Sequence, residues 1–115
     1  MSYLPSDIVL LPFPFSDLSA LKRRPVLIVA APDTRGDFLA VQITSQPQTA
    51  PALRLQDGDF LLGALPKASW VRVDKLFTLN VALIVHRAGQ LKPAAFAGIQ
   101  KGILSLAGLR GVASS

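Results

Sequence analysis

Two stretches of the chain alternate between hydrophobic and polar residues, a pattern that predicts strands with one buried face. The first stretch runs from Phe38 to Ser45 and the second from Ala68 to Lys75. One face carries Leu39, Val41 and Ile43 in the first stretch and Val71 and Val73 in the second. The opposite faces carry Ala40, Gln42 and Thr44, and Trp70, Arg72 and Asp74.

Other stretches are apolar without alternation, which suits strands covered on both faces. The clearest is Val26 to Ala31, which follows Pro25. Three further stretches are short and bounded by turn residues, and we interpret them as strands too: Asp7 to Leu11, Leu53 to Leu55, and Val81 to Arg87. The chain is therefore expected to contain five or six short strands.

A single helix is predicted near the C-terminal end, beginning at Pro93, because proline suits the first helical turn. Its apolar stripe recurs at helical spacing and consists of Phe96, Ile99, Ile103 and Leu106. The next position in that register is Arg110, which ends the stripe. Glycines at positions 98, 102 and 108 weaken the helix. We therefore expect it to depend on packing against the sheet.

These elements predict a protein that is mainly β with some α (α+β). Short strands, polar loops and one terminal helix favour a small, strongly curved antiparallel sheet or barrel with a helix packed on it. The 115 residues are expected to form one domain, residues 1–115, since no repeat or linker divides them.

Composition narrows the class of protein. The chain has no cysteine, which removes disulfides and thiolate metal sites and fits a reducing compartment. The longest strongly apolar run, Val26 to Ala31, is far shorter than the ~18 residues of a membrane span. The N-terminal region has no basic segment typical of a secretory signal. We expect a soluble, cytoplasmic protein with no membrane partner.

The formal net charge is +5, and its distribution is uneven. Residues 1–50 hold four cations and four aspartates, whereas residues 51–115 hold eight cations against three aspartates. The chain contains no glutamate. A positive field over part of the surface attracts polyanions such as nucleic acid, an acidic protein segment or an anionic membrane, although the charge also serves solubility.

The sequence offers little for metal or cofactor chemistry. His86 is the only histidine, and no cysteine or glutamate accompanies it, so no metal site and no cofactor are expected. His86 lies in an apolar stretch beside Arg87, and we interpret it as structural rather than catalytic. No glycine-rich phosphate-binding motif occurs.

Four polar residues at predicted strand ends remain as candidates: Arg24, Thr44, Arg72 and Asp74. Each has an ordinary explanation when taken alone. Arg24 can be a charge that flanks an aggregation-prone strand, and Thr44 can be a β-branched residue that suits a strand. Arg72 and Asp74 can form a surface ion pair. Together they resemble the components for metal-free RNA cleavage, in which the 2′-OH attacks its own phosphate. The protein then needs only to position the phosphate and stabilise its developing charge.

Four segments resemble successive motifs of the MazF/PemK-like toxin family. They are "SDIVLLPFPFSDLSALKRRPVLIV", "VQITSQ", "LPKASWVRVDKLFTLN" and "AGQLKP". The resemblance runs in order from about Ser6 to Leu106. It implies an endoribonuclease (mRNA interferase) of a type II toxin–antitoxin system. It also implies an SH3-like barrel with a C-terminal helix, a homodimer, metal-free cleavage of single-stranded RNA across the dimer groove, and an acidic antitoxin partner.

The resemblance also assigns roles to residues. The arginine of the family's Arg-Pro motif falls on Arg24, which would stabilise the phosphorane, and the threonine of its Thr-Ser motif falls on Thr44, which would bind the scissile phosphate. Arg72 would give electrostatic help, and Asp74 would accept the 2′-OH proton. The RNA-binding residues expected around them are Lys22, Arg23, Gln42, Ser45, Gln46 and Lys75.

The chain departs from the family pattern in three places. Ser6-Asp7 replaces Gly-Asp at the first strand, the loop from Pro12 to Lys22 has no histidine, and no carboxylate follows Pro93. Two other functions stay open. One is a non-enzymatic toxin of the same fold that acts on DNA gyrase, although the Trp-Gly-Ile ending of such toxins is missing here. The other is an inactive module that binds RNA without cutting it.

Overall fold

The computed structural model describes residues 2–12, 23–47 and 51–106. These residues form a seven-stranded sheet in which every paired strand is antiparallel, in the order β4-β6-β3-β2-β1-β7-β5. The strands are β1 (Asp7–Pro12), β2 (Arg23–Ala30), β3 (Asp37–Thr44), β4 (Ala52–Leu55), β5 (Phe60–Gly63), β6 (Ser69–Asn80) and β7 (His86–Leu91). One α-helix, α1 (Pro93–Leu106), follows them, and two short 3-10 helices span Asp57–Asp59 and Val81–Leu83. The expected class, mainly β with a C-terminal helix, is confirmed.

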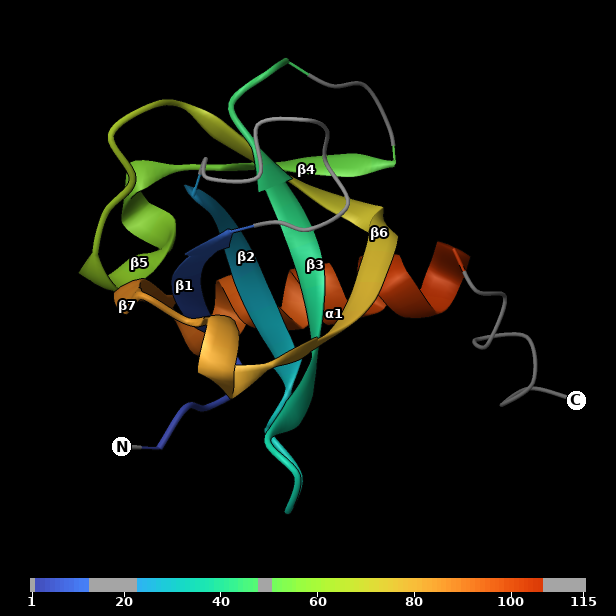
Figure 1. The fold of residues 1–115 in the computed structure, drawn as a ribbon. Coiled ribbons are helices and arrows are strands. Elements are labelled where there is room, and N and C mark those ends of the chain that lie inside the picture. Colours follow the sequence, from blue (N-terminus) through green and yellow to red (C-terminus); the bar gives the residue numbers. More distant parts are fainter. Residues whose placement is uncertain (1, 13–22, 48–50, 107–115) are drawn as a thin grey trace, which may run out of the picture.

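The sheet is strongly curved, and it curls around α1, which passes behind β2 and β3 in Figure 1. Register shifts interrupt four of its strand pairs, including β1 with β7 and β3 with β6. Such irregularities bend a strand and increase its local twist. The sheet therefore forms a curled half-barrel, which confirms the prediction of a small, strongly curved antiparallel sheet or barrel.

The core has two parts, one on each face of the sheet. On the face covered by α1, Leu27, Val41 and Val71 pack with Ile99 of the helix. On the other face, Val26 and Ile28 belong to a second cluster. The strand β2 thus alternates between two buried clusters, as expected for an apolar stretch covered on both sides.

The helix α1 begins at Pro93 and packs against the sheet, as predicted, and the strand it mainly contacts is β6. Ile99 is buried, and Phe96 and Ile103 lie against the same cluster. Leu106 does not extend the packed stripe, because its side chain is 51% exposed. The last turn of the helix therefore passes beyond the core. Arg110 lies outside the described residues.

Two sequence predictions of strands need correction. Val81 to Arg87 is not one strand: a 3-10 helix occupies Val81–Leu83, and β7 runs from His86 to Leu91. The side chain of Asn80 causes the break, since it accepts a hydrogen bond from the N–H of Ala82 and caps the turn. The strand β5 was not predicted, and β6 extends five residues beyond the expected end at Lys75.

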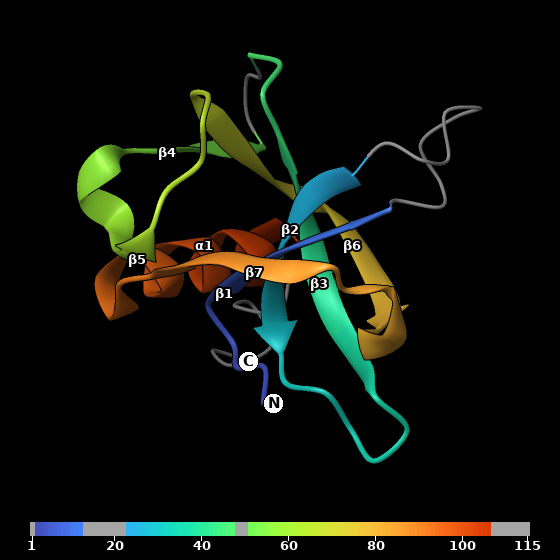
Figure 2. The ribbon, with the colours of Figure 1, turned by 60° about the vertical axis from the view of Figure 1, so that its left-hand side comes forward.

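Figure 2 shows β1 and β7 running side by side across the molecule. In Figure 1, β2 begins and β3 ends near the top of the view, whereas the turn that joins them lies at the bottom. No helix in the described part of the chain is both long and apolar enough to cross a membrane.

Candidate active site

The strands β2 and β3 stop pairing before they reach their outer ends. The last register pair at that end joins Val26 to Gln42. Pro25, which lies just beyond this pair, has no backbone N–H to donate to a neighbouring strand. Arg24 and Thr44 lie two residues beyond this pair, each on its own strand. The two residues that the sequence singled out therefore lie at the same end of β2 and β3, where the strands no longer pair.

A cavity of about 510 Å³ opens at this separation. Its walls come from the outer ends of β2 and β3, the segment between β5 and β6, and the facing parts of β1 and β7. The lining comprises Leu10, Arg23–Pro25, Ile43–Ser45, Ala64–Lys67, Ser69 and His86–Ala88. Strands distant in the sequence thus meet at one opening.

The cavity has a basic lining. Arg23, Arg24, Lys67 and Arg87 contribute four permanent cations, and His86 adds an imidazole. No carboxylate belongs to the described lining of this cavity. Cations that line a concave surface focus their field and concentrate anions there. The cavity is therefore suited to an anion such as a phosphate group.

The guanidinium of Arg24 has an unusual environment. The residue is half-buried, and its Nε atom is buried without a hydrogen-bond partner among the described residues. Leaving a buried donor unpaired costs about 1–3 kcal/mol, more for a charged group. An arginine fork matches the oxygens of a phosphate. A bound phosphate would thus supply the acceptor that the protein does not.

Thr44 is oriented by its own loop. Its Oγ1 atom accepts a hydrogen bond of 3.1 Å from the backbone N–H of Gln46. A hydroxyl that accepts one hydrogen bond still has its hydrogen to donate. Thr44 can therefore donate to a phosphate oxygen held by Arg24.

Arg72 and Asp74 are placed differently. They form a bidentate ion pair on β6, with Nε–Oδ1 and Nη2–Oδ2 distances of 3.0 and 2.8 Å. Hydrogen bonds from Arg72 hold the pKa of Asp74 below its usual range, and Asp74 raises the pKa of Arg72. Neither residue lines the cavity of Arg24 and Thr44. Arg72 does pair with Gln42 of β3, so the ion pair lies one strand to the side.

The register of β3 and β6 explains the position of Asp74. Val41 pairs with Leu76, but the next residue, Gln42, pairs with Arg72. The three residues between Arg72 and Leu76 are therefore left without partners on β3. Asp74 and Lys75 lie in this bulge and are exposed.

The structure divides the residues expected to bind RNA. Arg23 and Ser45 are exposed, and both line the cavity. Gln42, Gln46 and Lys75 do not belong to the lining. Lys22 lies outside the described residues, as does most of the loop between Pro12 and Lys22. The cavity and the neighbouring strands therefore bring together part of the expected set.

Among the lining residues that were not predicted as part of the site, three carry a titratable side chain: Lys67, His86 and Arg87. The sequence prediction that His86 lies within an apolar strand is wrong, because the residue is exposed at the first position of β7. Pairing with Leu10 of β1 sets it near the cavity. No local pattern could have identified these residues, because β7 and the segment after β5 reach the site only through pairing across the sheet.

Arg87 is held by a buried carboxylate. Asp7 is fully buried, and its oxygens accept hydrogen bonds from Leu4 N–H, Gln90 Nε2 and Arg87 Nη1. The Nη1–Oδ2 distance to Arg87 is 3.3 Å. Because a buried carboxylate needs several donors, this network fixes the start of β1 against β7. It also anchors one wall of the cavity.

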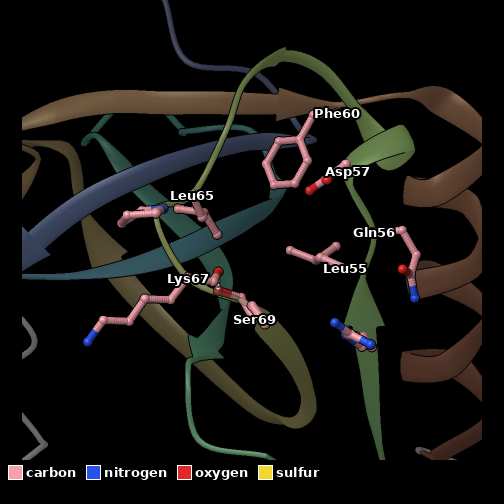
Figure 3. Close-up of a pocket in the computed structure, with 10 residues that line it drawn as sticks. Leu55, Gln56, Asp57, Phe60, Leu65, Lys67 and Ser69 are labelled. Carbon is pink, nitrogen blue, oxygen red and sulfur yellow. Dashed lines mark hydrogen bonds between the residues drawn. The ribbon is translucent and has the colours of Figure 1, made fainter.

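A second pocket of about 250 Å³ lies on the other side of the segment Leu65–Ser69, which lines both hollows. Figure 3 shows Leu55, Leu65 and Phe60 facing one another across it, with Gln56 and Asp57 at its edge. Arg54 also lines this pocket, and its guanidinium lies 5.7 Å from the centre of the Trp70 ring. This arrangement extends a surface of mixed apolar and cationic character from the cavity along β4.

Comparisons with known proteins agree with this geometry. A model of the "PemK-like, MazF-like toxin of type II toxin-antitoxin system" family matches residues 5–106. No curated protein sequence shows significant similarity to the chain.

Several solved structures share the fold. One is an endoribonuclease from a mycobacterial species, with a TM-score of 0.71 and 21% identity over 94% of this chain and 93% of that one. A second is the same kind of enzyme in complex with its cognate antitoxin, also from a mycobacterial species (TM-score 0.71, 23% identity, 93% and 96% covered). A third is a MazE–MazF complex from Deinococcus radiodurans (TM-score 0.74, 19% identity, 94% and 97% covered).

The family model covers residues 5–106 of the 115-residue chain. The chain therefore belongs to the PemK-like, MazF-like family of toxins of type II toxin–antitoxin systems.

Proposed function

We propose that this toxin is a metal-independent, sequence-selective endoribonuclease that cuts single-stranded mRNA. The observation that carries the proposal is the buried Nε of Arg24, which has no partner among the described residues and belongs to a basic cavity that Thr44 also lines. An anion with several acceptor oxygens would complete this site. The endoribonucleases that share the fold support the reaction type.

The proposed reaction uses a nucleophile from the substrate. The 2′-oxygen attacks the adjacent phosphorus, and the bond from phosphorus to the 5′-oxygen breaks. The RNA product ends in a 2′,3′-cyclic phosphate. Arg24 binds the nonbridging oxygens as charge develops on the phosphorane, and Thr44 donates a hydrogen bond to the same phosphate. Fixed donors of this kind stabilise the transition state more than the ground state.

The RNA is proposed to continue from the cavity onto the neighbouring strands. Arg23 and Ser45 lie at its rim, and Gln42 and Arg72 follow on β3 and β6. In this arrangement the ion pair of Arg72 and Asp74 contributes electrostatically beside the path rather than at the phosphate. Gln46 and Lys75, two of the remaining predicted RNA contacts, are proposed to flank the same path, and Lys22 stays a prediction outside the described residues. A substrate of mRNA places the protein in the cytoplasm.

Two macromolecular partners complete the proposal. The first is an acidic antitoxin, whose carboxylates would occupy the basic cavity in place of RNA phosphates; a cognate antitoxin is bound to one of the structural neighbours. The second is another copy of this chain. Large apolar side chains such as Leu39, Leu62 and Leu76 are exposed on the strands, which supports a homodimer. Light scattering at working concentration would measure the mass.

The central test replaces Arg24 by glutamine. We expect the Arg24→Gln variant to cut a mixed single-stranded RNA at least about 100-fold more slowly, in buffer with EDTA, because it loses the charge that stabilises the phosphorane. The matched control is Arg35→Gln, which removes an exposed cation from the turn at the opposite end of β2 and β3. Circular dichroism checks that both variants remain folded.

Other outcomes separate the alternatives. Undiminished cutting by Arg24→Gln would remove Arg24 from the site. A 2′-deoxy nucleotide at the cut position should block cleavage, and cleavage that continues there would exclude 2′-OH attack. Inhibition of gyrase supercoiling with RNA left intact would support the non-enzymatic toxin. Binding of RNA without cutting by the wild type would leave an inactive module.

A further inference from the structure

Resting on the endoribonuclease function proposed above, we propose that His86 is the general base that takes the proton from the attacking 2′-OH. The resemblance to the family suggested Asp74 for this step. The geometry points instead to the imidazole at the first position of β7, on a strand the sequence did not connect with the site.

The reaction needs an acceptor for one proton. A 2′-OH is a weak nucleophile until its proton is removed, and a positioned base contributes typically about 10²–10⁴-fold to the rate. Arg24 cannot serve, because an arginine has no acceptor and does not lose its proton in proteins. Thr44 cannot serve either, because a hydroxyl is a very weak base.

His86 lies at the right end of the sheet. It pairs with Leu10 of β1, and the next residue of β1, Leu11, pairs with Arg24 of β2. The two residues are therefore carried by the strands on either side of β1, near the same end of the sheet. Both residues line the same cavity of about 510 Å³, and His86 is exposed. A phosphodiester bound in this cavity would occupy the space that both residues line.

Elimination leaves His86 as the group that can accept a proton. The other charged residues of the described lining are Arg23, Arg24, Lys67 and Arg87, all of which are cations that donate only. Asp74 does not line the cavity, and both its oxygens are taken by Arg72. Hydrogen bonds from Arg72 also lower the pKa of Asp74, which makes it a weaker base. Histidine is the side chain whose ordinary pKa suits proton transfer near neutral pH.

The electrostatic surroundings of His86 come from three elements. Arg87 adjoins it on β7 and is tied to the buried carboxylate of Asp7 on β1. Arg24 of β2 and Lys67 of the segment before β6 line the same cavity as His86. The cavity therefore holds one carboxylate-bound cation and further cations that can bind phosphate.

The step balances without any further reagent. The 2′-oxygen forms a bond to phosphorus and gives its proton to an imidazole nitrogen of His86. The bond from phosphorus to the 5′-oxygen breaks, and that oxygen takes a proton from solvent water. The imidazolium then returns its proton to solvent, leaving a 2′,3′-cyclic phosphate and a 5′-hydroxyl end.

The first experiment compares cleavage by the wild type and His86→Gln under single-turnover conditions from pH 5 to pH 8. We expect the rate of His86→Gln to fall about 10²–10⁴-fold. We also expect it to lose the limb in which the wild-type rate rises with pH. In His86→Ala, added imidazole should restore part of the rate. A structural role would not produce rescue by imidazole. Arg35→Gln serves as the control for lost surface charge.

Two further experiments test the role of His86. The first distinguishes a general base from a general acid, and the second distinguishes His86 from Asp74 as the base. A substrate with sulfur in place of the 5′-oxygen has a leaving group that needs no proton. It should leave His86→Gln as slow as before, and full recovery would overturn the role of base. Asp74→Asn should retain the limb in which the rate rises with pH. If Asp74→Asn lost this limb and His86→Gln kept it, the assignment of His86 would be overturned.

The two proposals fail in different ways. A wild-type protein that leaves RNA intact would defeat the endoribonuclease function and this inference with it. A wild type that cuts RNA, with Arg24→Gln inactive and His86→Gln unchanged in rate and pH profile, would defeat the role of His86 alone.

Discussion

Arg72 and Arg24 differ in whether their guanidinium groups have a partner within the described part of the chain. Arg72 is paired with a carboxylate, whereas Arg24 is available to a ligand. Both oxygens of Asp74 bind the guanidinium of Arg72. The Nε of Arg24 is buried and has no acceptor among the described residues. An arginine that the protein leaves unpaired in a cationic cavity is suited to a ligand anion, whereas one held by a carboxylate is not.

The first prediction concerns how the ion pair of Arg72 and Asp74 contributes to stability at low pH. Because Arg72 lowers the pKa of Asp74 in the folded protein, the folded state binds this proton more weakly than the unfolded chain. The contribution of Asp74 to stability is therefore present above its ordinary pKa of 3.8 and is lost as the pH falls through the lower folded value. Asp74→Asn should lower the free energy of unfolding by less than about 1 kcal/mol at pH 7, and by less at pH 3.

Urea unfolding at the two pH values measures this difference. In an Arg72→Gln background, Asp74→Asn should lose most of its pH-dependent effect, since the partner that lowers the pKa is gone. An effect of Asp74→Asn that is equal at pH 3 and pH 7 would contradict the prediction.

At the scale of elements, the short strand β5 closes the site because it lies very close to β7. Gly63 ends β5 with a φ of +69°, and a Cβ atom there would collide with the carbonyl oxygen of Ala88. The next residue, Ala64, begins the segment that lines the cavity. The close approach of two backbones therefore sets the position of one wall.

We predict that Gly63→Ala destabilises the protein by at least about 2 kcal/mol, from the positive φ and from the clash with β7. The control is Gly58→Ala in the 3-10 helix nearby, where an added methyl group would meet no atom within 4 Å. Its effect should be within about 1 kcal/mol of zero. Urea midpoints of the two variants give the comparison, and equal midpoints would show that β5 tolerates a side chain at this position.

At the scale of the whole molecule, the curl of the sheet gathers cations that lie far apart in the sequence. Arg23 and Arg24 come from β2, Lys67 from the segment before β6, and Arg87 from β7. Asp74 is kept outside this cavity by the bulge in β6. The positive field that net charge only suggested is therefore concentrated at one end of the sheet.

This arrangement predicts salt-dependent binding of RNA. We assume that four cations of the cavity each neutralise one phosphate. A plot of the logarithm of the association constant against the logarithm of the salt concentration should then have a slope of about −3. A 2′-deoxy-blocked single strand allows binding to be measured without cutting. Arg24→Gln should reduce the size of the slope by about 0.7, and Arg35→Gln should not change it. A slope near zero for the wild type would contradict the prediction.

Much of the fold followed from local patterns. Alternation in Phe38–Ser45 and Ala68–Lys75 predicted the strands β3 and β6, because a strand turns its side chains to opposite sides with period two. The two faces of β3 were not separated into a buried and an exposed one, since Leu39 is 38% exposed and Ala40 on the opposite face is buried. The spacing of apolar residues after Pro93 predicted α1, because residues three or four positions apart lie on one face of a helix. The strand β5 was missed and Val81 to Arg87 was wrongly predicted as one strand, because a four-residue strand and an Asn-capped turn carry little periodic signal.

The sequence by itself determined the strands, the helix, the cationic excess and, through the family motifs, the importance assigned to Arg24 and Thr44. Only the tertiary structure decided which side chains share a cavity. It brought His86 to the end of β2, set Asp74 to one side in an ion pair, and left Arg24 without an acceptor among the described residues. The physical reason is that periodicity is a local property of the chain, whereas a site depends on the register of strands far apart in it.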